Sequence, residues 1–142
     1  MTAEQYRELD AAVEIALGWH LASPGKETDE HSIAPLWRHQ DGRERVGGPR
    51  RYSTDPVATA EVKRWIVEQG WNYGSGVEDM DGNTAFGSVW TGKRGSGCAL
   101  FTKTEDPADH DHDPVKAEAV ALCRAVLAAV EATGAGKEEP NG

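Results

Sequence analysis

Three stretches of the chain are rich in apolar side chains at the spacing expected of helices. The first covers about residues 4–21, the second about residues 56–69, and the third about residues 114–132. Within the first two, apolar positions follow one another at steps of three and four, which places them on one helical face. The third is apolar nearly all round. The pattern therefore predicts three helices.

The second and third helices have marked boundaries. Asp55 and Asp113 each precede a proline, Pro56 and Pro114. An aspartate in this position accepts hydrogen bonds from the free N–H groups of the first turn, and proline suits the first helical position because it has no N–H to satisfy. Gly70 is the expected left-handed residue after the second helix.

The segment between these two helices alternates at period two, as strands do. Residues 71–77, 84–91 and 98–103 are the expected strands. Asp81-Gly82 lies where a tight hairpin turn is expected, because both central positions of such a turn favour positive φ. Apolar residues occur on both faces of this meander, which suggests that both faces are covered.

These elements predict a single α+β domain over residues 1–133. Its order is helix, long loop, helix, three strands, helix, with an antiparallel meander of three strands or slightly more. Residues 22–51 form a long connection without a clear period, and residues 134–142 resemble a disordered tail. The apolar third helix indicates either the centre of the core or a subunit contact, which favours a homodimer or a higher homo-oligomer.

Composition and charge narrow the possible partners. Leu, Ile, Val and Phe total only 23 of 142 residues, so the core is modest, and the net charge of −9 disfavours nucleic acid and anionic lipid. The chain has no apolar run of about 18 residues and begins with an acidic, polar segment, so we expect neither a membrane span nor a signal peptide. Cys98 and Cys123 lie in apolar segments and are expected to be buried thiols in a reducing cytoplasm.

Three segments carry a family resemblance. They are LDAAVEIALGWH at residues 9–20, PRRYSTDPVATAEVKRWIVEQGW at 49–71 and AEAVALCRAVLAAV at 117–130. Together they resemble the ABA sandwich domain family of tailed phages and prophages. The resemblance implies a sheet sandwiched between helical layers, a location in the host bacterial cytoplasm, and accessory phage functions such as countering host defence. It implies no catalytic residues.

An arginine-bearing segment is the main candidate site. Five of the fifteen basic residues lie between positions 38 and 51, immediately before the second helix. Guanidinium groups, hydroxyls and free N–H groups at a helix start suit phosphate, and an aromatic ring there is able to stack on a base. Alternatively, Asp55 occupies the helix cap and the arginines pair with surplus surface acids. The candidate ligand-binding residues are Arg50, Arg51, Tyr52, Ser53, Thr54, Trp37 and Arg45.

The acidic loop before the third helix is a weaker candidate. His110 and His112 alternate with aspartates over residues 109–113, and imidazole and carboxylate bind divalent transition metals. A metal site needs three or four converging ligands, whereas acids in this loop also serve as solvated side chains and as the cap Asp113. We therefore predict no metal site and no cofactor.

No pattern of nucleophile, base or paired carboxylates predicts an enzyme. The expected function is that of a non-enzymatic phage or prophage accessory protein, which binds or sequesters a small anionic nucleotide-type ligand in anti-defence. The alternative is a protein-interaction module that inhibits or adapts a host protein without a small ligand. The expected partner is thus a small anion or a host protein, not a nucleic acid or a membrane.

Overall fold

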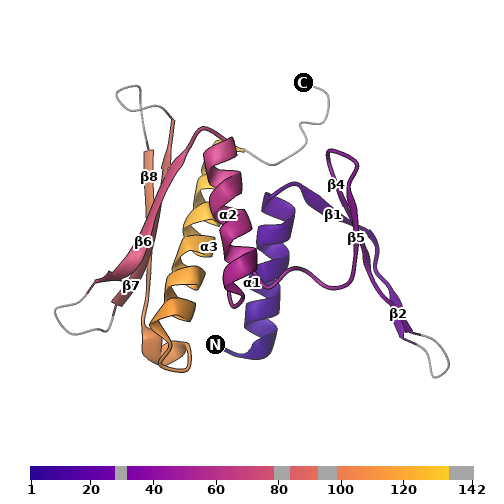
Figure 1. Cartoon of the computed structure of the whole chain (residues 1–142), viewed down its shortest axis with the longest axis horizontal. Helices are drawn as coiled ribbons and strands as arrows, with labels where there is room; N and C mark the ends of the chain where they lie inside the picture. The colour runs from indigo at the N-terminus through magenta and orange to yellow at the C-terminus, as the bar shows by residue number, and fades with distance from the viewer. Residues whose placement is uncertain (28–31, 79–83, 93–98, 135–142) are drawn as a thin grey trace.

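A computed structural model of the chain describes residues 1–27, 32–78, 84–92 and 99–134. Three α-helices lie side by side in the middle of the molecule, and a three-stranded antiparallel sheet lies on each side of them (Figure 1). The α+β class predicted from the sequence is therefore confirmed. In the described part of the chain, no helix is long and apolar enough to cross a membrane.

The helices begin where the sequence indicates. α1 (Ala3–Ala16) opens with a capping box, in which Thr2 and Gln5 satisfy each other's backbone N–H groups. α2 (Pro56–Glu68) and α3 (Pro114–Thr133) are capped by the predicted aspartates. Asp55 accepts from one backbone N–H of the first turn and Asp113 from two. Both predicted starts are confirmed. They were predictable because a helix cap depends on local sequence alone.

The end of α1 differs from the prediction. The helix stops at Ala16 rather than near residue 21, because Gly18 adopts a left-handed backbone with a φ of 99°. The next residues form strand β1 (Trp19–Ser23), which pairs with β4 (Leu36–His39). The apolar spacing that seemed to prolong the helix therefore belongs partly to a strand.

The long connection over residues 22–51 also contains strands, contrary to the expectation of an irregular loop. β5 (Glu44–Val46) pairs with β4, so that the sheet order is β1-β4-β5. The turn between these two strands holds Asp41-Gly42, with Gly42 at a φ of 96°. Two short strands, β2 (Lys26–Glu27) and β3 (Ser32–Ile33), form a separate hairpin.

The predicted meander is present. β6 (Asn72–Glu78), β7 (Thr84–Thr91) and β8 (Ala99–Glu105) are antiparallel in that order. The expected Asp81-Gly82 turn, the start of the third strand with Cys98, and residues 135–142 of the expected tail lie outside the described residues.

The layers do not form the expected sandwich of a sheet between helices. Instead the described helices lie between the two sheets, and α3 covers one face of β6-β7-β8 (Figure 1). Gly87 of β7 makes this contact possible, because a Cβ there would collide with the backbone of Leu122. The other face of this sheet meets no described helix.

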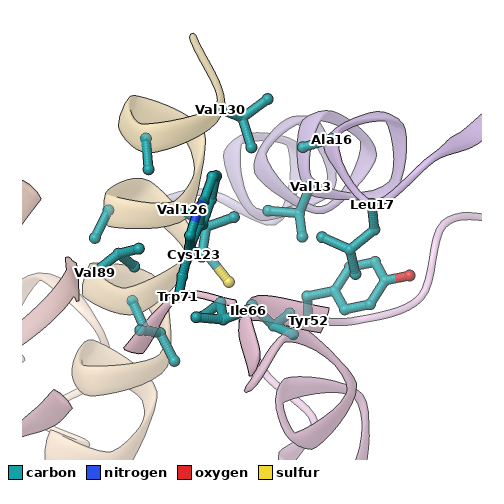
Figure 2. Packing of buried hydrophobic residues seen from close by; sticks show 14 of the residues in the cluster. Val13, Ala16, Leu17, Tyr52, Ile66, Trp71, Val89, Cys123, Val126 and Val130 are labelled. Carbon is teal, nitrogen blue, oxygen red and sulfur yellow. The ribbon is translucent and has the colours of Figure 1, made fainter. Parts of the chain in front are cut away.

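The core lies where α1, α2 and α3 meet (Figure 2). Val13, Ile66 and Val126 are fully buried there, and Trp71 follows Gly70 and packs back onto α2. Cys123 is fully buried among them, and burial raises the pKa of its thiol. Burial of α3 between a sheet and two helices explains its apolar surface without a second subunit.

Candidate functional site

The arginine-bearing segment folds back onto two carboxylates of α1. Glu14 is fully buried. The Tyr52 hydroxyl donates to Glu14 Oε1 at 2.9 Å, and the Arg50 backbone N–H donates to Oε2 at 2.8 Å. The Arg45 guanidinium forms an ion pair with the same carboxylate. A single side chain of α1 thus holds three points of this segment.

Asp10 binds the next part of the segment, one turn earlier on α1. Its Oδ1 accepts from the Ser53 backbone N–H at 2.9 Å and from the Ser53 hydroxyl at 2.7 Å. Residues four apart lie on one helical face, so both carboxylates point the same way. The group formed by Asp10, Glu14, Arg45, Tyr52 and Ser53 is called the carboxylate junction below.

Electrostatics in the carboxylate junction follow from burial. Burial raises the pKa of Asp10, and the hydrogen bonds from Ser53 oppose that rise. Burial also raises the pKa of Tyr52, assisted by the charge of Glu14. For Arg45, burial acts to lower the pKa, but Glu14 outweighs it and the pKa is raised. The tyrosine is therefore a neutral donor and the arginine a fixed cation.

Four of the seven predicted ligand-binding residues thus have partners within the chain. Arg45, Tyr52 and Ser53 bind the carboxylates of α1, and the Arg50 side chain pairs with Glu61 of α2. The chemistry predicted for an external anion is in part met by internal carboxylates. The alternative of pairing with surface acids fits Arg50 and Glu61, whereas Arg45 pairs with the buried Glu14.

The other three predicted residues are spread over the surroundings. Trp37 is buried, and its Nε1 has no hydrogen-bond partner among the described residues. Arg51 is exposed and lowers the pKa of Asp10 through its charge. Thr54 is exposed and lines a cavity of about 200 Å³ between the starts of α2 and α3. The structure does not bring these three together.

A larger cleft opens beside the carboxylate junction. Its volume is about 630 Å³, and it lies between the end of α1, the β4–β5 turn and α2. Sequence reasoning named two of its residues, Arg45 and Arg50. The full lining is Leu17, Gly18, Trp19, His39, Gln40, Asp41, Arg43, Glu44, Arg45, Arg50, Glu61, Arg64, Trp65, Glu68 and Gln69.

Aromatic rings and guanidinium groups are combined on one wall of this cleft. The guanidinium carbons of Arg43 and Arg45 lie 5.4 and 4.6 Å from the centre of the Trp19 ring. His39 meets the same ring edge-on at 5.0 Å. Its two ring nitrogens lie 3.0 Å from the Leu17 carbonyl oxygen and 3.1 Å from the Asp41 backbone nitrogen. This wall is therefore held in a fixed geometry by its own contacts.

The opposite wall is the exposed side of α2. Trp65 packs edge-on against Trp71, with ring centres 5.6 Å apart. Arg64 lines the cleft and has no ion pair among the described residues. Four arginines and four carboxylates line the cleft in total, so its formal charge is balanced. It offers donors for an anion, acceptors for hydroxyl or amino groups, and indole rings for stacking.

The two histidines of the acidic loop have different surroundings. His110 is buried, with Nδ1 at 2.6 Å from the Tyr6 hydroxyl and Nε2 at 3.0 Å from Glu105. His112 is exposed, with a left-handed φ of 56°. In the described ranges, no group of three or more His, Cys, Asp or Glu side chains is placed to hold a metal ion.

Asp10 and Glu14 were not among the predicted site residues, although the sequence carries a signal for them. Both acids lie next to the apolar stripe of the first helix, where the neighbouring position Val13 is fully buried. Acids four residues apart at the border of a buried face suggest a partner on another segment.

Comparison of the chain with protein-family models, curated proteins and solved structures found no match.

Proposed function

We propose that this protein is a non-enzymatic binding protein and that the cleft beside α2 takes a small nucleotide-type anion. One observation carries the proposal: four of the nine arginines of the chain line a single cleft together with two tryptophans. The cleft volume of about 630 Å³ lies within the range of ligand sites in proteins.

The balanced charge of the cleft favours a nucleotide over a bare anion. Guanidinium groups bind phosphate through paired N–H donors. Carboxylates such as Glu61 and Glu68 accept hydrogen bonds from ribose hydroxyls and base amino groups. The indole of Trp65 offers a face on which a base stacks. A ligand that is anionic at one end and a donor at the other meets both kinds of lining group.

The biological setting is proposed from the family resemblance alone. In that setting the protein is a phage or prophage accessory protein in the bacterial cytoplasm. It sequesters a nucleotide-type defence signal of the host. Sequestration requires tight binding and no chemistry, in keeping with the absence of a catalytic pattern in the sequence.

A thermal-shift and calorimetry panel of nucleotides, cyclic dinucleotides and ADP-ribose derivatives tests the cleft. A ligand at a hundredfold excess over its Kd stabilises the protein by about 2.7 kcal/mol. Arg64→Gln is expected to weaken binding about tenfold or more, because it removes a charge-assisted hydrogen bond. Arg7→Gln is the matched control, since Arg7 is exposed on α1 and does not line the cleft. A panel without any shift, or equal losses in both variants, contradicts the proposal.

A second candidate function is a protein-interaction module that inhibits or adapts a host protein. It is favoured by the face of β6-β7-β8 that no described helix covers, where Leu100 is 56% exposed. Specific capture of one host protein by a chain that binds no nucleotide would support this function over the first.

A further inference from the structure

The uncovered face of the β6-β7-β8 sheet carries the apolar side chains of Phe86, Trp90 and Leu100. Residues of β7 alternate between the two faces of the sheet. Gly87 and Val89 share one face, and their neighbours Phe86, Ser88 and Trp90 share the other. Because Gly87 touches α3, the aromatic residues point away from the helices. Leu100 of β8 pairs with Trp90 and lies on the same outer face. We call this surface the outer sheet face.

Two glycines of β6 make the outer sheet face flat. A Cβ on Gly74 would lie 3.1 Å from Cη2 of Trp90, and one on Gly76 would lie 3.2 Å from Cε1 of Phe86. Each ring therefore lies down over a glycine instead of projecting from the sheet. Between the rings, the hydroxyls of Ser88 and Thr102 bond to each other at 2.9 Å, which satisfies the polar groups at the centre of the face.

The outer sheet face is also almost uncharged. Glu78, at the end of β6, is the single charged residue on this face among the described strand residues, although the chain carries a net charge of −9. An acidic chain repels its own copies through most of its surface. Here two copies meet without that repulsion, because the same neutral, flat patch lies on both sides of a two-fold contact.

We propose that the outer sheet face is the contact between two copies of this chain, packed sheet against sheet. This goes beyond the proposed nucleotide cleft, whose lining includes no residue of β6, β7 or β8. Face-to-face packing at the usual separation of about 10 Å buries Leu100 and the exposed sides of both rings. The dimer then has the layer order helices, sheet, sheet, helices across its centre.

The size of the face sets the strength of the dimer. Three strands of about seven residues cover roughly 300 Å² on each copy, from strand spacing and rise. Stable interfaces bury about 800 Å² on each side, so this contact belongs to the weak class. We expect association with a Kd of roughly 10 µM to 1 mM.

Sedimentation velocity of the full chain over about 10 µM to 1 mM tests the dimer in that range. The weight-average mass is expected to rise from 15.3 kDa towards twice that value. Leu100→Glu is expected to weaken association at least tenfold, because it places two carboxylates in an apolar contact. Leu100→Lys by itself is expected to weaken association to the same extent, although it makes the net charge of the chain less negative. An equimolar mixture of the two variants regains association, because opposite charges then meet.

Val67→Glu is the matched control, since Val67 is 59% exposed on α2, away from the outer sheet face. It is expected to associate like the wild type, and circular dichroism checks that every variant is folded. A wild type that stays monomeric over the whole range overturns the proposal and leaves the face to another partner. Equal weakening by Val67→Glu and Leu100→Glu also overturns it, because the effect would then reflect net charge alone.

Discussion

Arginine and carboxylate meet in two neighbouring regions of this molecule, and the surroundings differ. In the carboxylate junction, Glu14 is fully buried and the Arg45 side chain is 18% exposed. Across the cleft, the side chains of Arg50 and Glu61 are 40% and 35% exposed. Burial removes the water that would otherwise solvate a charge. Each charge of the Arg45–Glu14 pair therefore depends on the other, whereas water is able to solvate Arg50 and Glu61 when their pair is broken.

The difference assigns separate tasks to the two regions. The carboxylate junction joins α1 to the segment before α2, through a tyrosine hydroxyl, a serine hydroxyl and two backbone N–H groups. A ligand that displaced these contacts would have to replace all of them. The exposed Arg50–Glu61 pair contributes little free energy, so an anion is able to take the place of Glu61 on Arg50. The buried carboxylate junction thus fixes the shape of the site, and the exposed groups of the cleft are the ones available to bind a ligand.

The largest expected effect is on stability when Glu14 loses its charge. Glu14→Gln keeps the size of the side chain but leaves Arg45, whose side chain is only 18% exposed, without a counter-ion. Breaking a buried pair from one side costs about 3–5 kcal/mol. Urea unfolding, followed by circular dichroism, is expected to show a loss in that range.

A second variant separates the lost pair from a general packing defect. Glu14→Gln combined with Arg45→Met removes both charges, so part of the lost stability is expected to return. If the double variant were no more stable than Glu14→Gln alone, the comparison would fail, because Arg45 would not depend on Glu14.

The pH dependence of stability tests the other carboxylate of the junction. Burial raises the pKa of Asp10 above its ordinary value of 3.8, so the folded chain holds this proton more tightly than the unfolded chain does. Its contribution to stability is full below pH 3.8 and is lost as the pH rises through the raised pKa. Each unit of difference corresponds to about 1.4 kcal/mol.

Asp10→Asn isolates this contribution, because the amide oxygen still accepts from Ser53 but does not titrate. We expect the stability of the wild type relative to Asp10→Asn to fall as the pH rises above 3.8. Unfolding curves of both chains over the acidic range measure this difference. A difference that is flat with pH would place Asp10 in contact with water and outside the buried region.

Local signals in the sequence account for the elements that were predicted correctly. The starts of α2 and α3 depend on Asp55 and Asp113 and their following prolines, which act within one turn. The β6-β7-β8 meander follows from period-two alternation. The end of α1 was placed too late because His20 continues the spacing of three from Leu17 and so suits a helix face as well as a strand. Only pairing with β4, which is distant in sequence, selects the strand.

The candidate site was predicted in its chemistry but only partly in its geometry. Residues before α2 do form an anion-binding arrangement, but the anions that Tyr52 and Ser53 bind are carboxylates of α1. A sequence shows that donors are concentrated in one segment and does not show which acceptor reaches them first. Arg64 and Trp65 entered the site by tertiary packing, because α2 turns that side towards the β4–β5 turn.

A smaller effect is expected from the open pair. Glu61→Gln removes the partner of Arg50, but water replaces it, so the stability is expected to change by about 0.2–1 kcal/mol. The same unfolding assay as for Glu14→Gln applies. A loss as large as that of the buried pair would show that the cleft is closed to water and would remove the distinction between the two regions.

Salt is expected to produce the smallest effect and the sharpest contrast. Double-mutant cycles give the coupling energy between Arg50 and Glu61 and between Arg45 and Glu14. Raising the ionic strength from 0.1 to 1 M shortens the screening length from about 10 to 3 Å, which weakens exposed pairs and hardly affects buried ones. The Arg50–Glu61 coupling should therefore lose a few tenths of a kcal/mol, approaching zero. The Arg45–Glu14 coupling should stay constant, because dissolved ions do not reach Glu14 in the folded chain. Equal salt dependence of the two pairs would mean that the junction opens to solvent, and the internal carboxylates would then be open to displacement by a ligand.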